Sequence, residues 1–120
     1  MVSNVDLQNA FDAMRNSKVS LFHAGERELA TREALKKAEA AVLLVNAADP
    51  KKLGGNEAAR NATIRELTFD ERKDAEKAEA EKRECQLAFD LACMAVDCLK
   101  WQIRNEQAAA DCEAQRLGAI

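Results

Sequence analysis

Proline, glycine and aromatic residues are scarce in this chain of 120 residues, which has one Pro, four Gly, one Trp and no Tyr. Strands and their turns draw on those residues, so their scarcity excludes an all-β fold. Uncharged runs are short as well: residues 40–48 form the longest near the middle, far below the roughly 20 residues of a membrane span. The first residues have neither the basic cluster nor the apolar core of a signal peptide. We therefore expect a cytoplasmic protein with no membrane segment.

Charge is plentiful but nearly balanced. The formal net charge is -3, which excludes a global basic field that could hold nucleic acid or an anionic membrane. Hydrophobic residues make up 48% and charged residues 32% of the chain, the balance of long helices and coiled coils. The apolar content also excludes disorder. These observations predict a single all-helical domain over residues 1–120.

A long first helix is predicted over residues 4–47, capped by the Ser3 hydroxyl with Asp6 in its first turn. Gly25 interrupts its middle, which favours a bend or a close helix crossing there. Residues spaced by three or four form a row, nine of twelve apolar, that predicts one face packed along the whole helix; its members are Leu7, Ala10, Met14, Ser17, Leu21, Ala24, Glu28, Thr31, Leu35, Ala38, Val42 and Val45.

Asp49-Pro50 ends this helix, and a loop over residues 48–55 follows. Asn56 is suited to cap a short helix over residues 56–67. Thr68 and Glu71 have the spacing of a capping box, which predicts another helix from residue 69 to about residue 114. The two long helices have similar lengths and a short connection, so the fold class is all-α: a long, coiled-coil-like antiparallel hairpin with a short third helix in the connection.

The last helix changes character at residue 85. Before it, three alanines break a run of charges and predict a solvated helix with a narrow seam. After it, the apolar face is wider than a two-helix seam requires, with Leu91, Ala95 and Cys98 on its flank and with Met94 and Trp101 pointing elsewhere. Another copy of the chain is the simplest source of the missing cover, so we expect a helical bundle completed by oligomerisation. The predicted oligomer or partner interface comprises Phe89, Ala92, Val96, Leu99, Trp101 and Ile103.

Trp101, between Lys100 and Arg104, has two interpretations. Trp and Arg are favoured at binding hot spots, so it could anchor a different protein, or it could lie inside a homo-oligomer. We favour the homo-oligomer.

Side chains suited to chemistry do not gather in the sequence. Cys85, Cys93, Cys98 and Cys112 contain no Cys-x-x-Cys pair; we expect small buried hydrophobes rather than zinc ligands or redox groups. The only histidine, His23, lies far from them, and a di-metal carboxylate bundle would need more than one. The acids alternate with Lys and Arg as on a solvated face. We predict no catalytic, cofactor-binding or metal-binding residue, and no enzyme.

The connection between the long helices is basic. Lys51, Lys52, Arg60 and Arg65 lie near two glycines and a helix start, where free amides and positive charge could hold an anion. A hairpin turn with solvated ends accounts for the same residues, and we favour it.

The same segment carries a family resemblance. Residues 52–62 (KLGGNEAARNA), then Leu67-Thr68 and Glu71-Arg72 ahead of a long charged helix, resemble small uncharacterised helical-hairpin proteins of bacteriophages and prophages. The resemblance covers residues 50–105 and departs from that pattern in the cysteine-rich apolar stretch after Cys85. It implies a phage or mobile-element accessory protein and brings no catalytic residues.

Together these observations predict a non-enzymatic protein-interaction module that forms a dimer or tetramer and binds another protein, as a phage accessory or inhibitor. The alternative is a nucleic-acid-associated accessory protein that uses the basic connection; the few nearby aromatics and the acids that follow argue against it. A metal-dependent enzyme is the third hypothesis.

Overall fold

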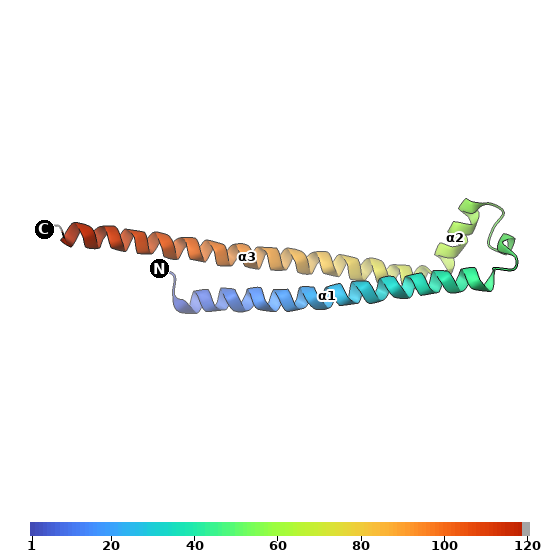
Figure 1. The fold of residues 1–120 in the computed structure, drawn as a ribbon, viewed down its shortest axis with the longest axis horizontal. Coiled ribbons are helices and arrows are strands. Elements are labelled where there is room, and N and C mark those ends of the chain that lie inside the picture. Colours follow the sequence, from blue (N-terminus) through green and yellow to red (C-terminus); the bar gives the residue numbers. More distant parts are fainter. Residues whose placement is uncertain (119–120) are drawn as a thin grey trace. The chain divides into compact units, whose positions relative to one another are not determined.

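The computed structural model describes residues 1–118, which form helices and their connections without a β-strand. The elements are α1 (Asn4–Val45), a 3-10 turn η1 (Pro50–Lys52), α2 (Glu57–Leu67) and α3 (Phe69–Gly118) (Figure 1). The long helices α1 and α3 pack against each other as an antiparallel hairpin, with α2 in the connection. The predicted all-α hairpin is confirmed, and the observed helix bounds lie within four residues of the expected ones.

Reciprocal hydrogen bonds start α1. The Asp6 amide donates to Ser3 Oγ at 3.1 Å, and the Ser3 amide donates to Asp6 Oδ2 at 3.0 Å. Each side chain satisfies an amide that has no partner within the helix, so the predicted cap is present. The hydrogen bond from the Ser3 amide, followed by the influence of the nearby Ser3 hydroxyl, holds the pKa of the Asp6 carboxyl below its ordinary value.

The connection is set by Gly54 and Asn56. Asn56 Oδ1 accepts a hydrogen bond from the Ala59 amide at 2.8 Å, which is the predicted cap of α2. Gly54 lies against the first turn of α2: a Cβ built on it would come within 2.8 Å of the Ala59 carbonyl carbon and of the Arg60 nitrogen. Only a residue without a side chain permits this approach. Leu53 is buried beside it.

Thr68 is the single residue between α2 and α3, and it does not form the predicted capping box with Glu71. Its hydroxyl donates instead to the Ile64 carbonyl at 2.7 Å, and its amide donates to the same oxygen at 3.0 Å. The Thr68 side chain is fully buried. A buried hydroxyl must find a partner nearby, and the Ile64 carbonyl in the last turn of α2 has a second lone pair within reach. Thr68 therefore closes α2 with its hydroxyl and amide, while its carbonyl accepts a hydrogen bond from the Arg72 amide at 3.0 Å in the first turn of α3.

The chain divides into two compact units, and each long helix contributes one stretch to each. The first unit contains Met1–Leu21 and the part of α3 from Cys85 onward, coloured blue and orange to red in Figure 1. Its chain start reaches Glu106, whose Oε1 accepts a hydrogen bond from the Val2 amide at 3.1 Å. Val96 is its buried centre, with 2% of its surface exposed.

The second unit, Phe22–Glu84, contains the rest of α1, the connection, α2 and the charged start of α3. Ala24 and Ala78 are buried where the two long helices meet. Small side chains at such positions let two helix backbones approach closely, which leaves little apolar surface to bury. The narrow alanine seam predicted for residues 70–84 is present at Ala75 and Ala78, whereas Ala80 is exposed.

Gly25 does not mark a close crossing. A Cβ built on it would meet no atom within 4 Å, so the expectation of a tight helix contact there was wrong. In residues 1–118, no helix combines the length and the apolar character that crossing a bilayer requires.

Candidate interaction surface

Few hydrophobic side chains are buried in the part of the chain that the structure describes. Those that are buried are Ala24, Leu53, Ala78 and Val96, two of them alanines. Scattered exposed apolar residues are ordinary, but a fold that leaves most of its large hydrophobic side chains in solvent has little core of its own. The exposed set comprises Met1, Val5, Val19, Phe22, Leu29, Leu43, Leu44, Val45, Leu67, Phe69, Leu87, Leu91, Met94, Trp101 and Leu117.

One face of α3 in the first unit is covered to differing degrees. We call it the inner stripe: Cys85, Phe89, Ala92, Val96, Leu99 and Ile103, all half-buried except Val96, which is buried. Two lysines cover rings in the same unit, with Lys18 Nζ 4.9 Å from the centre of the Phe89 ring and Lys100 Nζ 5.7 Å from that of Phe11. Their aliphatic stems can cover apolar surface while the ammonium groups stay in water.

The structure thus divides the predicted interface. Five of its residues, Phe89, Ala92, Val96, Leu99 and Ile103, belong to the inner stripe and are already partly or wholly covered within the first unit. Trp101 lies apart from them and is exposed. An interface drawn only on the inner stripe would compete with α1 for the same side chains.

A second apolar row of α3 is not covered. We call it the outer stripe: Leu87, Leu91, Met94, Cys98 and Trp101. Its members are spaced by four, three, four and three residues, the repeat of a coiled-coil seam. The exposed fractions are 60% for Leu87, 56% for Leu91, 61% for Met94 and 64% for Trp101. At 3.6 residues per turn, this row lies on roughly the opposite side of α3 from the inner stripe.

Sequence reasoning found parts of the outer stripe without recognising the whole. Leu91 and Cys98 are expected on the flank of the first row, and Met94 and Trp101 are expected to point elsewhere. The missed signal was the repeat itself. A helix with two apolar rows, each at alternating spacings of three and four, is built to contact helices on two sides.

The cysteines differ from the expectation of burial. Cys85 and Cys93 are half-buried, and Cys98 and Cys112 are exposed; all four are free thiols. Burial failed because the hairpin covers only one side of α3, and Cys98 lies on the other. Within residues 1–118, no three His, Cys, Asp or Glu side chains come together as a metal-binding group.

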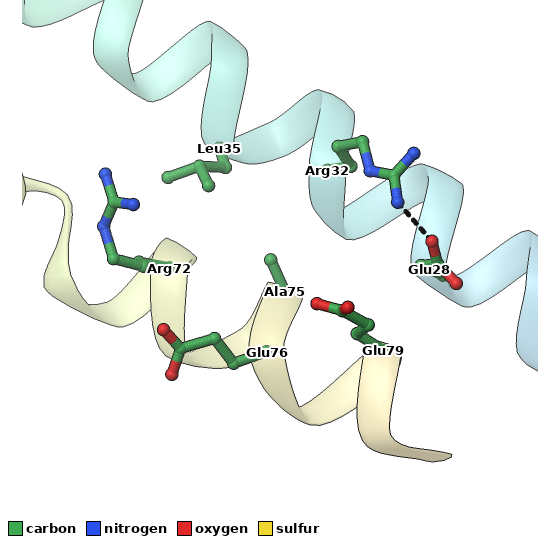
Figure 2. A pocket seen from close by; sticks show the side chains of 7 residues that line it. All are labelled: Glu28, Arg32, Leu35, Arg72, Ala75, Glu76 and Glu79. Atoms are coloured by element: carbon green, nitrogen blue, oxygen red, sulfur yellow. Dashed lines mark hydrogen bonds and ion pairs between the residues drawn. The ribbon is translucent and has the colours of Figure 1, made fainter. Parts of the chain in front are cut away.

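The second unit contains a small groove between α1 and α3 (Figure 2). Leu35 and Ala75 face each other across it, with charged side chains around them. Glu28, largely buried, forms ion pairs with Arg32 and with Lys82, whose Nζ lies 3.3 Å from Glu28 Oε2. This carboxylate interrupts the apolar row of α1, and a paired charge at such a position can fix the register of two helices.

Further ion pairs surround this groove. Arg72 Nη2 donates to Glu39 Oε1 at 2.9 Å, which links α3 to α1. Arg83 Nη2 donates to Glu79 Oε1 at 2.6 Å along α3, and this bond holds the pKa of the Glu79 carboxyl below its ordinary value. The Arg72–Glu39 and Lys82–Glu28 pairs link α1 to α3, whereas the Arg83–Glu79 pair lies within α3. The groove is therefore part of the hairpin contact.

The predicted anion contacts lie in and after the connection. Lys51 and Lys52 are exposed in η1, Arg65 is exposed on α2, and Arg60 is half-buried. The Asn56 side chain occupies the Ala59 amide, one of the helix-start donors that an anion would use.

His23 is also on the surface, with Nδ1 3.7 Å from Glu26 Oε2.

The outer stripe is the most distinctive unsatisfied feature of the described chain. Comparisons with protein-family models, with curated proteins and with solved structures found no match.

Proposed function

We propose that this chain is a helical protein-interaction module that works as an oligomer, and that α3 supplies its contact surface. The observation that carries the proposal is the outer stripe: four large apolar side chains at coiled-coil spacing, each more than half exposed. Water contact with such a row is unfavourable at about 25 cal/mol per Å² of apolar surface, and a further helix removes that cost.

The sparse core supports the same proposal. Over residues 1–118, the buried hydrophobic side chains are one valine, one leucine and two alanines. Such a hairpin gains little from folding alone, since each ordered residue costs about 1–2 kcal/mol of conformational entropy. Helices of this length take most of their stability from packing. Assembly would supply the missing burial, and the protein could then present its remaining surface to other proteins.

The resemblance of residues 50–105 to phage and prophage hairpin proteins supplies the biological setting that we propose, an accessory or inhibitor protein that acts by binding rather than by catalysis. In this setting the charged start of α3 and the connection stay available to a partner, because assembly uses the outer stripe of the first unit.

Sedimentation velocity tests the proposal. We expect the wild-type chain to sediment as an oligomer at micromolar concentration and Leu91→Asp to shift it strongly towards monomer, because a charge in the stripe would lose its water without gaining a partner. Glu79→Ala is the matched control on the charged part of α3 and should leave the distribution unchanged. A wild-type monomer throughout the accessible concentration range would refute the proposal.

The alternative, a nucleic-acid accessory role for Lys51, Lys52, Arg60 and Arg65, has a separate test. Binding carried by a few surface cations is strongest at low salt. We expect no affinity for single- or double-stranded DNA or RNA under that condition, and tight binding would favour the alternative.

A further inference from the structure

The flanks of the outer stripe carry different chemistry. On one side lie Asp90 and Asp97, each one residue before a stripe position, and Arg104, which continues the same spacing of seven residues beyond the stripe. On the other side, one residue after stripe positions, lie Ala88, Ala95 and Gln102. In a coiled coil these flanking positions face the partner helix and choose its direction.

In a parallel pair of two copies, the acidic flank would face neutral residues of the partner helix. In parallel pairs, a residue before one stripe position faces a residue after the next stripe position of the partner. Asp90 would face Ala95 of the second copy, and Asp97 would face Gln102. Two acids would then lose part of their solvation without meeting a positive charge.

An antiparallel partner brings like flanks together. With Met94 placed against Cys98 of the second copy, Leu91 meets Trp101, and Asp90 comes opposite Arg104. The two-fold axis repeats each of these contacts, which gives four apolar layers and two ion pairs. The neutral flank meets itself with Ala95 against Ala95, which permits close approach.

The neighbouring register that sets Met94 against Asn105 keeps only two of the four apolar layers, and charge excludes the neighbouring register in the other direction. Sliding one copy by a heptad sets Met94 against Leu91 and brings Asp90 opposite Asp97 twice, so that attraction becomes repulsion. The inner stripe lies on the far side of α3, so α1 does not obstruct either arrangement.

We propose that a second copy of this chain binds the outer stripe antiparallel, in the register that places Met94 against Cys98 and Asp90 against Arg104. This inference rests on the proposed oligomeric function and specifies its contact. The Asp97 carboxylates of the two copies approach each other at the two-fold axis and limit the affinity of the dimer.

A charge exchange tests the register without changing any apolar residue. Equilibrium sedimentation of the full chain at low salt should give a dissociation constant about tenfold higher for Arg104→Glu, because two attractive pairs become repulsive. The double variant Asp90→Arg with Arg104→Glu should recover most of the loss. If the wild type dimerises but the double variant is as weak as the single one, the register is wrong while the proposed function stands.

The Asp97 pair gives a change in the opposite direction. Asp97→Asn should tighten the dimer about twofold, the size of relieving one pair of like surface charges. Asn and Asp have nearly the same shape, so a helix-folding effect is small. Weaker dimerisation of this variant would contradict the placement of Asp97 at the axis.

Disulfide trapping gives a geometric answer. Met94→Cys, with Cys85, Cys93 and Cys112 changed to Ala, should form a crosslinked dimer with Cys98 of the other copy under mild oxidation. The control that keeps Met94 should stay uncrosslinked, because the two Cys98 residues would be offset by about four residues, or 6 Å, along the axis. This offset adds to the lateral spacing of two helices whose axes lie about 8–10 Å apart, so the Cα atoms are too far apart for a disulfide. Crosslinking of the control with equal efficiency would establish a parallel pair and overturn the inference, whereas a monomeric wild type would refute the proposed function as well.

Discussion

Val96 and Leu91 lie five residues apart on α3, yet the structure gives them different roles. Val96 is buried, whereas Leu91 is more than half exposed. Val96→Ala removes two buried methyl groups at about 0.8 kcal/mol each and leaves a small cavity. Alanine returns a few tenths of a kcal/mol of helix propensity. We therefore expect a loss of about 1.5 kcal/mol in the free energy of unfolding.

Leu91→Ala is the matched comparison. In one chain it removes a side chain that is already largely in water, so the expected loss is below about 1 kcal/mol. Its larger effect should come through assembly: unfolding of an oligomer depends on protein concentration, whereas unfolding of a monomer does not. The Val96→Ala loss should be present at every concentration, whereas most of the Leu91→Ala loss should disappear on dilution.

Urea unfolding followed by circular dichroism at two protein concentrations, a hundredfold apart, measures both effects. The reasoning fails if Val96→Ala is neutral, since the centre of the first unit would then be misplaced. It fails equally if Leu91→Ala costs as much as Val96→Ala in dilute solution, because the outer stripe would then be part of the core of a single chain.

Three further predictions concern two glycines and two carboxyl groups. Gly54→Ala should destabilise the connection, because the added Cβ would overlap the first turn of α2. Gly55→Ala is the control, since its Cβ would meet no atom within 4 Å. The midpoints of thermal unfolding of the two variants measure the difference. Gly25→Ala should raise the free energy of unfolding by about 0.5–1 kcal/mol, since the helix gains propensity and meets no obstacle; a destabilised variant would reveal a close contact there. Asp6 and Glu79 have lowered pKa values in the folded chain, so their contributions to the free energy of unfolding are present above the ordinary pKa values of 3.8 and 4.5. These contributions are lost as the pH falls through the lower folded values. An acid titration of stability should show this decline, and a rise in stability over that range would contradict it.

Much of the hairpin could be predicted because local and long-range signals agree. The row of α1 from Leu7 to Val42 is buried or half-buried at every position, with only Val45 fully exposed at its end. The change in composition at residue 85 coincides with the boundary between the two compact units at Glu84 and Cys85. The caps at Ser3 and Asn56 follow from residue types that satisfy free amides.

The failures have a common physical origin, because the partner of a side chain depends on three-dimensional context. Thr68 has the spacing of a cap, but it is buried against the end of α2 and uses its hydroxyl there. Cys98 has apolar neighbours in sequence, but it points away from α1 and is exposed. Trp101 is exposed and lies on a different side of α3 from Val96, as the sequence indicated, and its place in an interface stays a prediction.

Beyond Glu106, where the chain start makes its last contact with α3, every described residue from Gln107 to Gly118 is exposed. This stretch has no neighbour to pack against in the first unit, so its helix rests on the intrinsic preference of its alanines and long polar side chains. Short unsupported helices fray from the end inwards. Amide protons there should exchange with solvent deuterium well before those around Val96, and protection that reached the tail only at high protein concentration would show that a neighbouring molecule extends over it.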